Sequence, residues 1–152
     1  MSVVKDVTFE GQKYNLDNRD RVAAQAAFSG GIGRKVIETG DAAYTVTEAD
    51  MGAIITNRGS TGTKVITLPD ASAALKGGHV TIVTVVAQKT TITSQTADTL
   101  IVNGDAEADS IEQASATIGT LAECYCDGTN WIVATLGNTP GGTNAVRWNK
   151  AS

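Results

Sequence analysis

The stretch from Thr120 to Gly137, TLAECYCDGTNWIVATLG, constrains the fold of this chain more than any other. Two runs of strand-forming residues, Leu121–Cys126 and Trp131–Leu136, flank the four residues Asp127-Gly128-Thr129-Asn130. Asp and Gly tolerate the left-handed backbone that a tight reversal requires, so the stretch predicts a β-hairpin that closes the fold.

Side chains alternate between the two faces of each predicted strand. In the first run one face carries Ala122, Cys124 and Cys126, and the other carries Leu121, Glu123 and Tyr125. In the second run one face carries Trp131, Val133 and Thr135, and the other carries Ile132, Ala134 and Leu136. Cys124 and Cys126 are about 7 Å apart on one face, too far for a disulfide, so we expect reduced, buried thiols and assembly in a reducing cytoplasm. Trp131 is predicted to be a core residue.

The rest of the chain predicts short strands joined by tight turns, because it has 16 glycines, 2 prolines and only 5% aromatic residues. The expected strands are Lys35–Glu38, Ala43–Thr47, Ala53–Asn57, Lys64–Leu68, Val80–Ala87, Thr90–Ser94, Thr99–Val102 and Ala114–Ile118, before the closing pair. Val80–Val86 is apolar on both faces, which indicates a central strand. No period of 20 to 50 residues repeats, which argues against a solenoid. We therefore predict an all-β fold, an antiparallel β-sandwich or small β-barrel with an extended N-terminal arm and one short helix.

Three segments are predicted: an arm over residues 1–34, a β domain over 35–137 and a flexible tail over 138–152. Residues 1–16 favour a strand or extended arm with a turn at Gly11-Gln12. The run that begins at Asp17 predicts a short helix that ends before Gly30-Gly31. That helix either lies on its own domain or belongs to an arm that grips a neighbouring subunit. The tail is either disordered or anchored by Trp148 on this subunit or a neighbour.

Charge and hydropathy exclude several partners. The net charge of −4 argues against nucleic acid, and residues 41–152 carry 6 basic and 11 acidic side chains, whereas residues 1–40 carry 6 and 5. An acidic body with a near-neutral arm fits a protein that docks through its N-terminus. The longest apolar run, Val80–Ala87, is too short to span a bilayer, and the N-terminus lacks the features of a signal peptide. We expect no membrane partner.

Catalytic and metal-binding patterns are weak. His79 is the single histidine, Cys124 has no base nearby in the sequence, and there is no G-x-S-x-G motif. The glycine-rich runs before Lys35 and Lys64 do not match a phosphate-binding loop. Asn103–Asp109 holds three carboxylates, for which a solvated acidic loop is favoured over a calcium site. We therefore expect no enzyme activity and no cofactor. A hydrolase domain ranks far behind the two binding functions described next.

The order of landmarks from Tyr44 to Gly137 resembles a module of tailed-phage virion proteins, found in capsid decoration (cement) proteins and in head or tail fibre subunits. The landmarks here are Tyr44, Gly52, Asn57-Arg58-Gly59, Leu68-Pro69, Gly77-Gly78, Cys126-Asp127-Gly128 and Trp131. The resemblance implies a homotrimer on the outside of the capsid, bound to the major capsid protein and stabilising the shell after assembly in the host cytoplasm. The alternative it implies is a phage fibre or receptor-binding module that recognises glycans. The compact length, without a coiled coil or shaft repeat, favours decoration.

Several apolar residues in the flanking segments have too little surrounding chain to bury them, so they are the predicted contacts with the capsid or with other subunits. They are Val3, Val4, Phe9, Val22, Ala26, Phe28 and Trp148.

Overall fold

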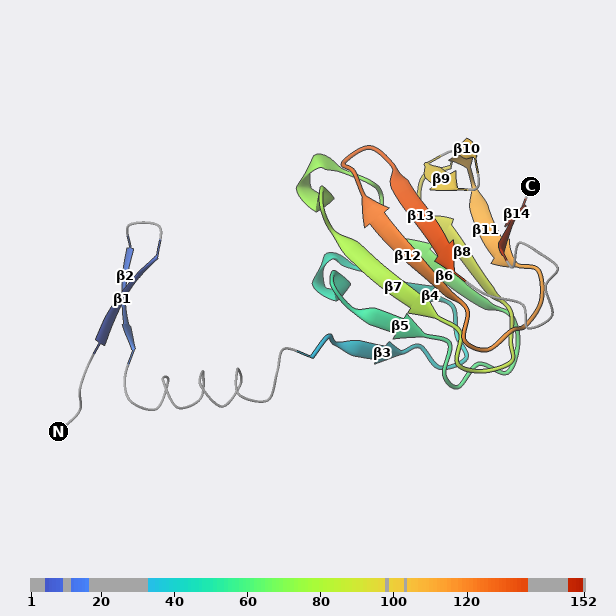
Figure 1. The fold of residues 1–152 in the computed structure, drawn as a ribbon, viewed down its shortest axis with the longest axis horizontal. Coiled ribbons are helices and arrows are strands. Elements are labelled where there is room, and N and C mark those ends of the chain that lie inside the picture. The colour runs from blue at the N-terminus through green and yellow to red at the C-terminus, as the bar shows by residue number, and fades with distance from the viewer. Residues whose placement is uncertain are drawn as a thin grey trace. The chain divides into compact units, whose positions relative to one another are not determined.

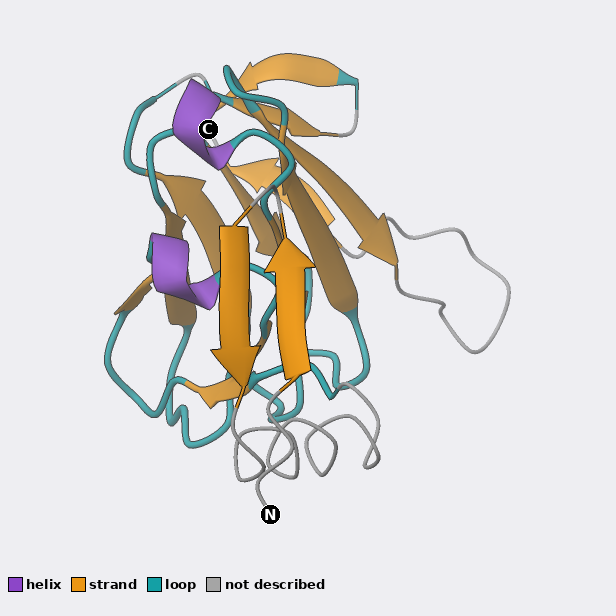
Figure 2. Cartoon of the chain, turned by 90° about the vertical axis from the view of Figure 1, so that its left-hand side faces the viewer, coloured by secondary structure: helices purple, strands orange, loops and turns teal. Residues whose placement is uncertain are grey.

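The computed structural model describes residues 5–9, 12–16, 33–97, 99–102, 104–136 and 148–151. The chain divides into two compact units, Met1–Gly33 and Arg34–Ser152. In both units the described residues form β-strands, and helix is limited to the 3-10 turns η1 (Glu48–Asp50) and η2 (Ala73–Leu75) (Figure 2). The predicted all-β class is confirmed.

The first unit contains a two-stranded antiparallel hairpin. Strand β1 (Lys5–Phe9) pairs with β2 (Gln12–Leu16), and Phe9 lies opposite Gln12 in the register. Of the alternatives for residues 1–16, a strand or an extended arm, strands are observed, and Gln12, predicted to lie in a turn, begins β2. The short helix predicted from Asp17 lies outside the described residues.

The second unit contains two sheets. Their strands are β3 (Val36–Glu38), β4 (Tyr44–Thr45), β5 (Ile54–Thr56), β6 (Lys64–Leu68), β7 (His79–Val83), β8 (Thr90–Ser94), β9 (Leu100–Val102), β10 (Asp105–Ala108), β11 (Ser110–Gln113), β12 (Leu121–Cys126), β13 (Trp131–Leu136) and β14 (Trp148–Ala151). A seven-stranded sheet has the order β10-β9-β13-β12-β7-β5-β3, and a five-stranded sheet has the order β14-β11-β8-β6-β4 (Figure 1). Strand β7 is central, as its two apolar faces predict.

Strands β3 to β8 wind like a coil. They alternate between the two sheets, and each strand lies parallel to the previous strand of its own sheet. Val36 pairs with Ile54, 18 positions later, but Ile54 pairs with Thr81, 27 positions later. The unequal length of the coils explains why no repeat is visible in the sequence. The antiparallel expectation was therefore wrong for this part of the chain, and the sheets are mixed.

The closing hairpin is antiparallel, as predicted, with Cys126 opposite Trp131. The Asp127 carboxylate accepts hydrogen bonds from the backbone N–H groups of Thr129 and Asn130, at 2.8 and 2.7 Å. Gly128 takes a φ of +99°, in the left-handed region that glycine favours. The side chain and the glycine together fix the turn, which in turn fixes the register of both strands.

Two expectations between residues 103 and 118 were wrong. Ala114–Ile118, predicted to be a strand, forms a turn, and the strand is β11, just before it. Residues 105–108, predicted to lie in an acidic loop, form β10 against β9. The buried Gln113 accounts for the first shift, because its Oε1 accepts the backbone N–H of Thr90 at 2.8 Å. A glutamine is normally expected at the surface, but here it lies in the core because its side chain satisfies a buried backbone group.

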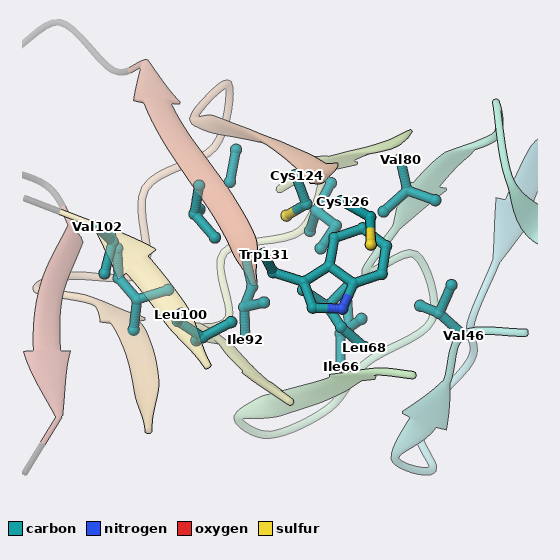
Figure 3. Close-up of a cluster of buried hydrophobic side chains, with 14 of the residues drawn as sticks. Val46, Ile66, Leu68, Val80, Ile92, Leu100, Val102, Cys124, Cys126 and Trp131 are labelled. Atoms are coloured by element: carbon teal, nitrogen blue, oxygen red, sulfur yellow. The ribbon is translucent and has the colours of Figure 1, made fainter. Parts of the chain in front are cut away.

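Inward side chains from both sheets meet in one buried apolar cluster (Figure 3). Trp131 lies near its middle, fully buried, and donates its indole N–H to the Pro69 carbonyl at 2.7 Å. Cys124 and Cys126 are buried free thiols beside it. The predictions of a core Trp131 and of two unbridged cysteines are therefore confirmed.

The last described strand differs from the predicted tail. Within the segment 138–152, for which flexibility was predicted, Trp148–Ala151 forms β14 and pairs with β11. Trp148 is 1% exposed and belongs to the core cluster of its own chain. Of the alternatives for this residue, the anchor on its own subunit is the one observed.

Buried polar side chains stabilise the corners of the coil, which are the loops that connect its successive strands. Asn57 makes four hydrogen bonds to the backbone of residues 85–88. The Lys64 ammonium donates to the carbonyls of Thr39, Gly40 and Ala42. Gly59 has a φ of +85°, and a Cβ there would lie 3.2 Å from the Gly40 Cα, so two corners approach closely.

Asp50 anchors a further corner. Its carboxylate accepts hydrogen bonds from the Lys35 ammonium at 2.9 Å and the Tyr44 hydroxyl at 2.9 Å, and from the backbone N–H and hydroxyl of Thr47. Burial raises the pKa of Asp50, but these hydrogen bonds outweigh that effect and lower the pKa from 3.8 to about 2. The first two strands of the coil are thus tied through one ionised side chain.

Candidate interaction face

Most of the predicted interface residues lie outside the described part of the chain. Those are Val3, Val4, Val22, Ala26 and Phe28. Phe9 ends β1, and its backbone pairs with Gln12. Trp148 is the exception: because it is packed in its own core, its side chain is not available to a capsid protein or a neighbouring subunit. The prediction that Trp148 is an interface contact is corrected accordingly.

The two candidate reactive side chains sit in structural surroundings. Burial, together with the nearby Glu123, raises the pKa of the Cys124 thiol far above its ordinary range, so the thiolate nucleophile is suppressed. His79 is half-buried, and its ring stacks on Tyr125 with centroids 6.2 Å apart and planes at 29°. Among the described residues, neither side chain has a hydrogen-bond or ion-pair partner that would activate it for acyl or proton transfer.

Among the described residues, no group of three or more His, Cys, Asp or Glu side chains is placed to hold a metal ion. The predicted acidic loop is partly β10, where the Asp105 carboxylate accepts the backbone N–H of Glu107 at 2.9 Å. In the same described part of the chain, no helix has both the length and the apolar character to cross a membrane.

The most distinctive surface is the outer face of the seven-stranded sheet, defined as the side opposite the core cluster. The register aligns its outward side chains in three rows across the strands. The first row is Ile101, Ile132, Tyr125 and His79; the second is Ala134, Glu123, Thr81, Ile54 and Val36; the third is Leu136, Leu121, Val83, Thr56 and Glu38. We call this surface the apolar face.

Large apolar side chains on this face are solvent-exposed. Leu136 is 62% exposed, Val36 57%, Tyr125 45% and Ile132 40%. These residues come from three strands and spread across most of the width of the sheet. Tyr125 and Ile132 are neighbours across β12 and β13, whereas the buried Thr81 and Thr56 lie on the strands between them and Val36. Clustered exposed apolar side chains mark an interaction site, whereas isolated exposed apolar residues need no explanation.

Polar groups on the apolar face are few and mostly satisfied. The Glu123 carboxylate accepts a hydrogen bond from the Thr81 hydroxyl at 2.8 Å. Glu38, at the margin, forms an ion pair with Arg58 at 3.0 Å. None of the outward strand positions in the three rows is Lys or Arg. The centre of the face therefore carries one carboxylate with a described partner, and the exposed ion pair of Glu38 and Arg58 lies at the margin.

The outer face of the five-stranded sheet is different. Its two aligned rows are Val65, Thr91 and Glu112, and Thr45, Thr67, Thr93 and Ser110. Threonine and serine hydroxyls and a carboxylate dominate it, and Val65, 37% exposed, is its single large apolar residue. The two sheets share one core, and one of them has a polar outer surface whereas the other has an apolar outer surface. An exposed apolar surface is unusual for a sheet in water and indicates an interaction site.

A signal for this face is present in the sequence. The alternation that places Cys124 and Trp131 inward also places Tyr125, Ile132 and Leu136 outward. A strand that is apolar on both sides suggests burial on both sides. Here the second side is exposed in the described part of the chain, so the pattern marks a surface that no described element buries.

The landmarks of the resemblance have structural roles. Asn57 and Gly59 hold coil corners, and the Pro69 carbonyl accepts the Trp131 indole N–H. The backbones of Gly77 and Cys126 are hydrogen-bonded to each other at 2.8 Å. No protein-family model and no curated protein matches this sequence.

Proposed function

We propose that this protein is a bacteriophage capsid decoration protein that binds the outside of the head shell and stabilises it. In this proposal the two sheets pack as a β-sandwich, residues 1–34 act as an extended arm that contacts the major capsid protein, and the working unit is a homotrimer on the virion surface. The chain acts by binding and carries no enzyme activity.

The apolar face is the observation that carries the proposal. It is an exposed surface suited to contact with protein, in a chain whose reactive side chains are buried or structurally engaged. The ordered landmarks from Tyr44 to Trp131 add the resemblance to virion proteins, and their roles in turns and packing suit a structural protein. The polar outer face of the five-stranded sheet suits a surface that stays in water.

A second candidate is a fibre or receptor-binding module that recognises glycans. Tyr125 is 45% exposed and stacked on His79, and an exposed aromatic ring is a common platform for sugar rings. Glu123, two residues away on the same face, offers a hydrogen-bond acceptor. This reading requires a ligand on a flat face rather than in a concave site, which makes it the weaker candidate.

Immunogold electron microscopy of the phage particles that contain this chain distinguishes the two functions. Decoration predicts label over the whole head and loss of label when residues 1–30 are deleted, with the far-UV circular dichroism of the remaining β domain preserved. A fibre module predicts label at the tail tip or at fibres alone. Label restricted to the tail would contradict the decoration proposal, and undiminished head label after the deletion would contradict attachment through the N-terminal arm.

A further inference from the structure

We infer that residues 39–42 form a binding site for a primary ammonium group, and that this chain fills the site with the ammonium of its own Lys64. Three backbone carbonyls, those of Thr39, Gly40 and Ala42, converge on this group and accept its hydrogen bonds. We call them the carbonyl cage. An ammonium on a single carbon carries three N–H donors, one for each carbonyl, so the ligand class of the cage is a primary alkylammonium ion. The inference goes beyond the decoration function and does not rest on it.

Lys64 reaches the cage from a strand of the five-stranded sheet. It begins β6, where its backbone N–H donates to the Lys89 carbonyl at 2.7 Å and its Cα pairs with that of Thr90. The cage lies in the loop between β3 and β4. The Lys64 side chain is fully buried on this path, with 0% of its residue surface exposed. A buried charge is stable only where polar groups replace the lost water, and here backbone carbonyls supply them.

The distances in the cage are those of hydrogen bonds rather than of metal coordination. The Lys64 Nζ lies 3.2 Å from the Thr39 oxygen and 3.3 Å from the Gly40 oxygen, and it also donates to the Ala42 oxygen. Calcium and magnesium bind oxygen at about 2.0–2.6 Å. The charge of the Asp41 carboxylate favours a cation at this position, although burial has the larger effect and lowers the pKa of Lys64. A singly charged ion with N–H donors therefore fits the cage better than a bare divalent metal.

The cage is held in place by hydrogen bonds that do not involve the Lys64 side chain. Gly40 has a φ of +63°, in the left-handed region, and its N–H donates to the Arg58 carbonyl at 3.0 Å. The Asp41 carboxylate accepts the backbone N–H and the hydroxyl of Thr61 at 2.7 and 2.9 Å. Because these bonds remain when Lys64 is shortened, the loop should keep its carbonyls directed at the position of the lost ammonium. A free alkylammonium ion of the right length can then replace the side chain.

The test replaces the deleted atoms of Lys64 with a free ion. Lys64→Ala removes Cγ, Cδ, Cε and Nζ, which are the atoms of n-propylammonium. Thermal melts of the full chain are recorded in n-propylammonium chloride and in tetramethylammonium chloride, which has the same charge but no N–H donor. Lys89→Ala is the matched control, because it removes the same atoms from a side chain that is 39% exposed and pairs with Glu112 at 3.7 Å.

We expect n-propylammonium, at about ten times its dissociation constant, to raise the Tm of Lys64→Ala by at least about 3 °C over tetramethylammonium. The two salts should have the same effect on the wild type, whose cage is filled, and on Lys89→Ala, which leaves the cage filled. Equal Tm values for Lys64→Ala in the two salts, with a cooperative melt in both, would overturn the inference.

A measurement on the wild type decides the matter if Lys64→Ala does not fold. In a proton–nitrogen correlation spectrum of the chain with isotope-labelled lysine, the Lys64 ammonium should exchange slowly with water and show couplings across hydrogen bonds to the carbonyl carbons of the cage. A Lys64 ammonium that exchanges as fast as those of Lys35, 59% exposed, and Lys89 would contradict the inference. Neither measurement involves phage particles, so failure of the ammonium site leaves the decoration proposal to its own immunogold test.

Discussion

Replacing Asn57 with alanine should destabilise the loop at residues 85–88, which its side chain binds through hydrogen bonds. Asn57 is fully buried directly after β5, and its amide nitrogen donates to the carbonyls of Val86 and Gln88 at 2.9 and 3.1 Å. Its amide oxygen accepts the backbone N–H groups of Val85 and Val86 at 2.8 and 3.0 Å. All four bonds cross between chain segments about 30 residues apart. Asn57→Ala removes them together and leaves four backbone groups without these partners.

The expected loss in the free energy of unfolding follows from the number of hydrogen bonds removed and from how well water reaches the released backbone groups. Each hydrogen bond contributes about 0.5–1.5 kcal/mol net, so four give roughly 2–6 kcal/mol. Val85, Val86 and Gln88 are half-buried, so water can reach part of the released backbone and reduce the penalty. We therefore expect Asn57→Ala to lower the free energy of unfolding by about 3 kcal/mol. Gln95→Ala, which truncates an exposed amide side chain, is the matched control and should change stability by less than about 0.5 kcal/mol.

Two measurements check this prediction. Urea unfolding gives the global change, and native-state hydrogen exchange gives the local one. The amides of Val85 and Val86 should lose protection in Asn57→Ala, while the amide of Thr84, which donates to the Thr120 carbonyl at 3.0 Å, should keep it. A stability loss below about 1 kcal/mol with unchanged exchange at Val85 and Val86 would refute the reasoning that this one side chain holds the corner.

Two other predictions concern the core and the acid limit of stability. Trp131→Ala should cost about 3–5 kcal/mol in urea unfolding, against less than about 1 kcal/mol for the exposed Val65→Ala; a small loss for Trp131→Ala would show that the centre of the core is elsewhere. The folded-state pKa of Asp50, about 2, is below its ordinary value of 3.8, so its contribution to stability is present above about pH 4 and is lost as pH falls toward 2. The stability difference between the wild type and Asp50→Asn should therefore shrink by about 2 kcal/mol between pH 5 and pH 2, and a constant difference would contradict the assigned hydrogen bonds.

Local chemistry made the hairpin of β12 and β13 predictable from sequence. Asp127 and Gly128 supply a turn that needs no tertiary partner, and strict alternation on both sides fixes which residues point inward. The same reasoning correctly placed Trp131 in the core and Cys124 and Cys126 on its side. Patterns within about 18 residues were enough, because the interactions that decide them are equally local.

The pairing of strands could not be predicted in the same way. Parallel strands are joined through corners, and here the corners differ in length, so Val36 and Ile54 are closer in sequence than Ile54 and Thr81. The residues that hold these corners, such as Asn57 and Lys64, are polar side chains whose partners are backbone groups far away in sequence. Composition assigns such residues to the surface, and only the fold supplies the partners that bury them. Strand β14 is a similar case, because its partner β11 lies 35 or more residues earlier.

The candidate site was mispredicted for a related reason. Sequence reasoning looked for contacts in segments too short to bury their own apolar residues, which led to Trp148, and the fold buries that residue itself. The second side of β12 and β13 was identified from the alternation but was not predicted to be an exposed surface, because apolar residues on a strand give no indication of whether another element covers them. Knowing that Tyr125, Ile132 and Leu136 are exposed required knowing that no described element of this chain covers them.

The antiparallel strands β11 and β12 pair with the edges that the parallel coil of β3 to β8 leaves open. A stack of parallel coils leaves its last strands, β7 and β8, with an open row of backbone N–H and carbonyl groups, and such an edge recruits other chains indiscriminately. Strand β12 covers the edge of β7, and β11 covers the edge of β8, both in antiparallel register. At the other end of the stack the edge strands β3 and β4 have three and two residues, and short edges offer few pairing groups. The outer strands at the covered end are then β10 and β14, whereas large apolar side chains of the apolar face stay exposed.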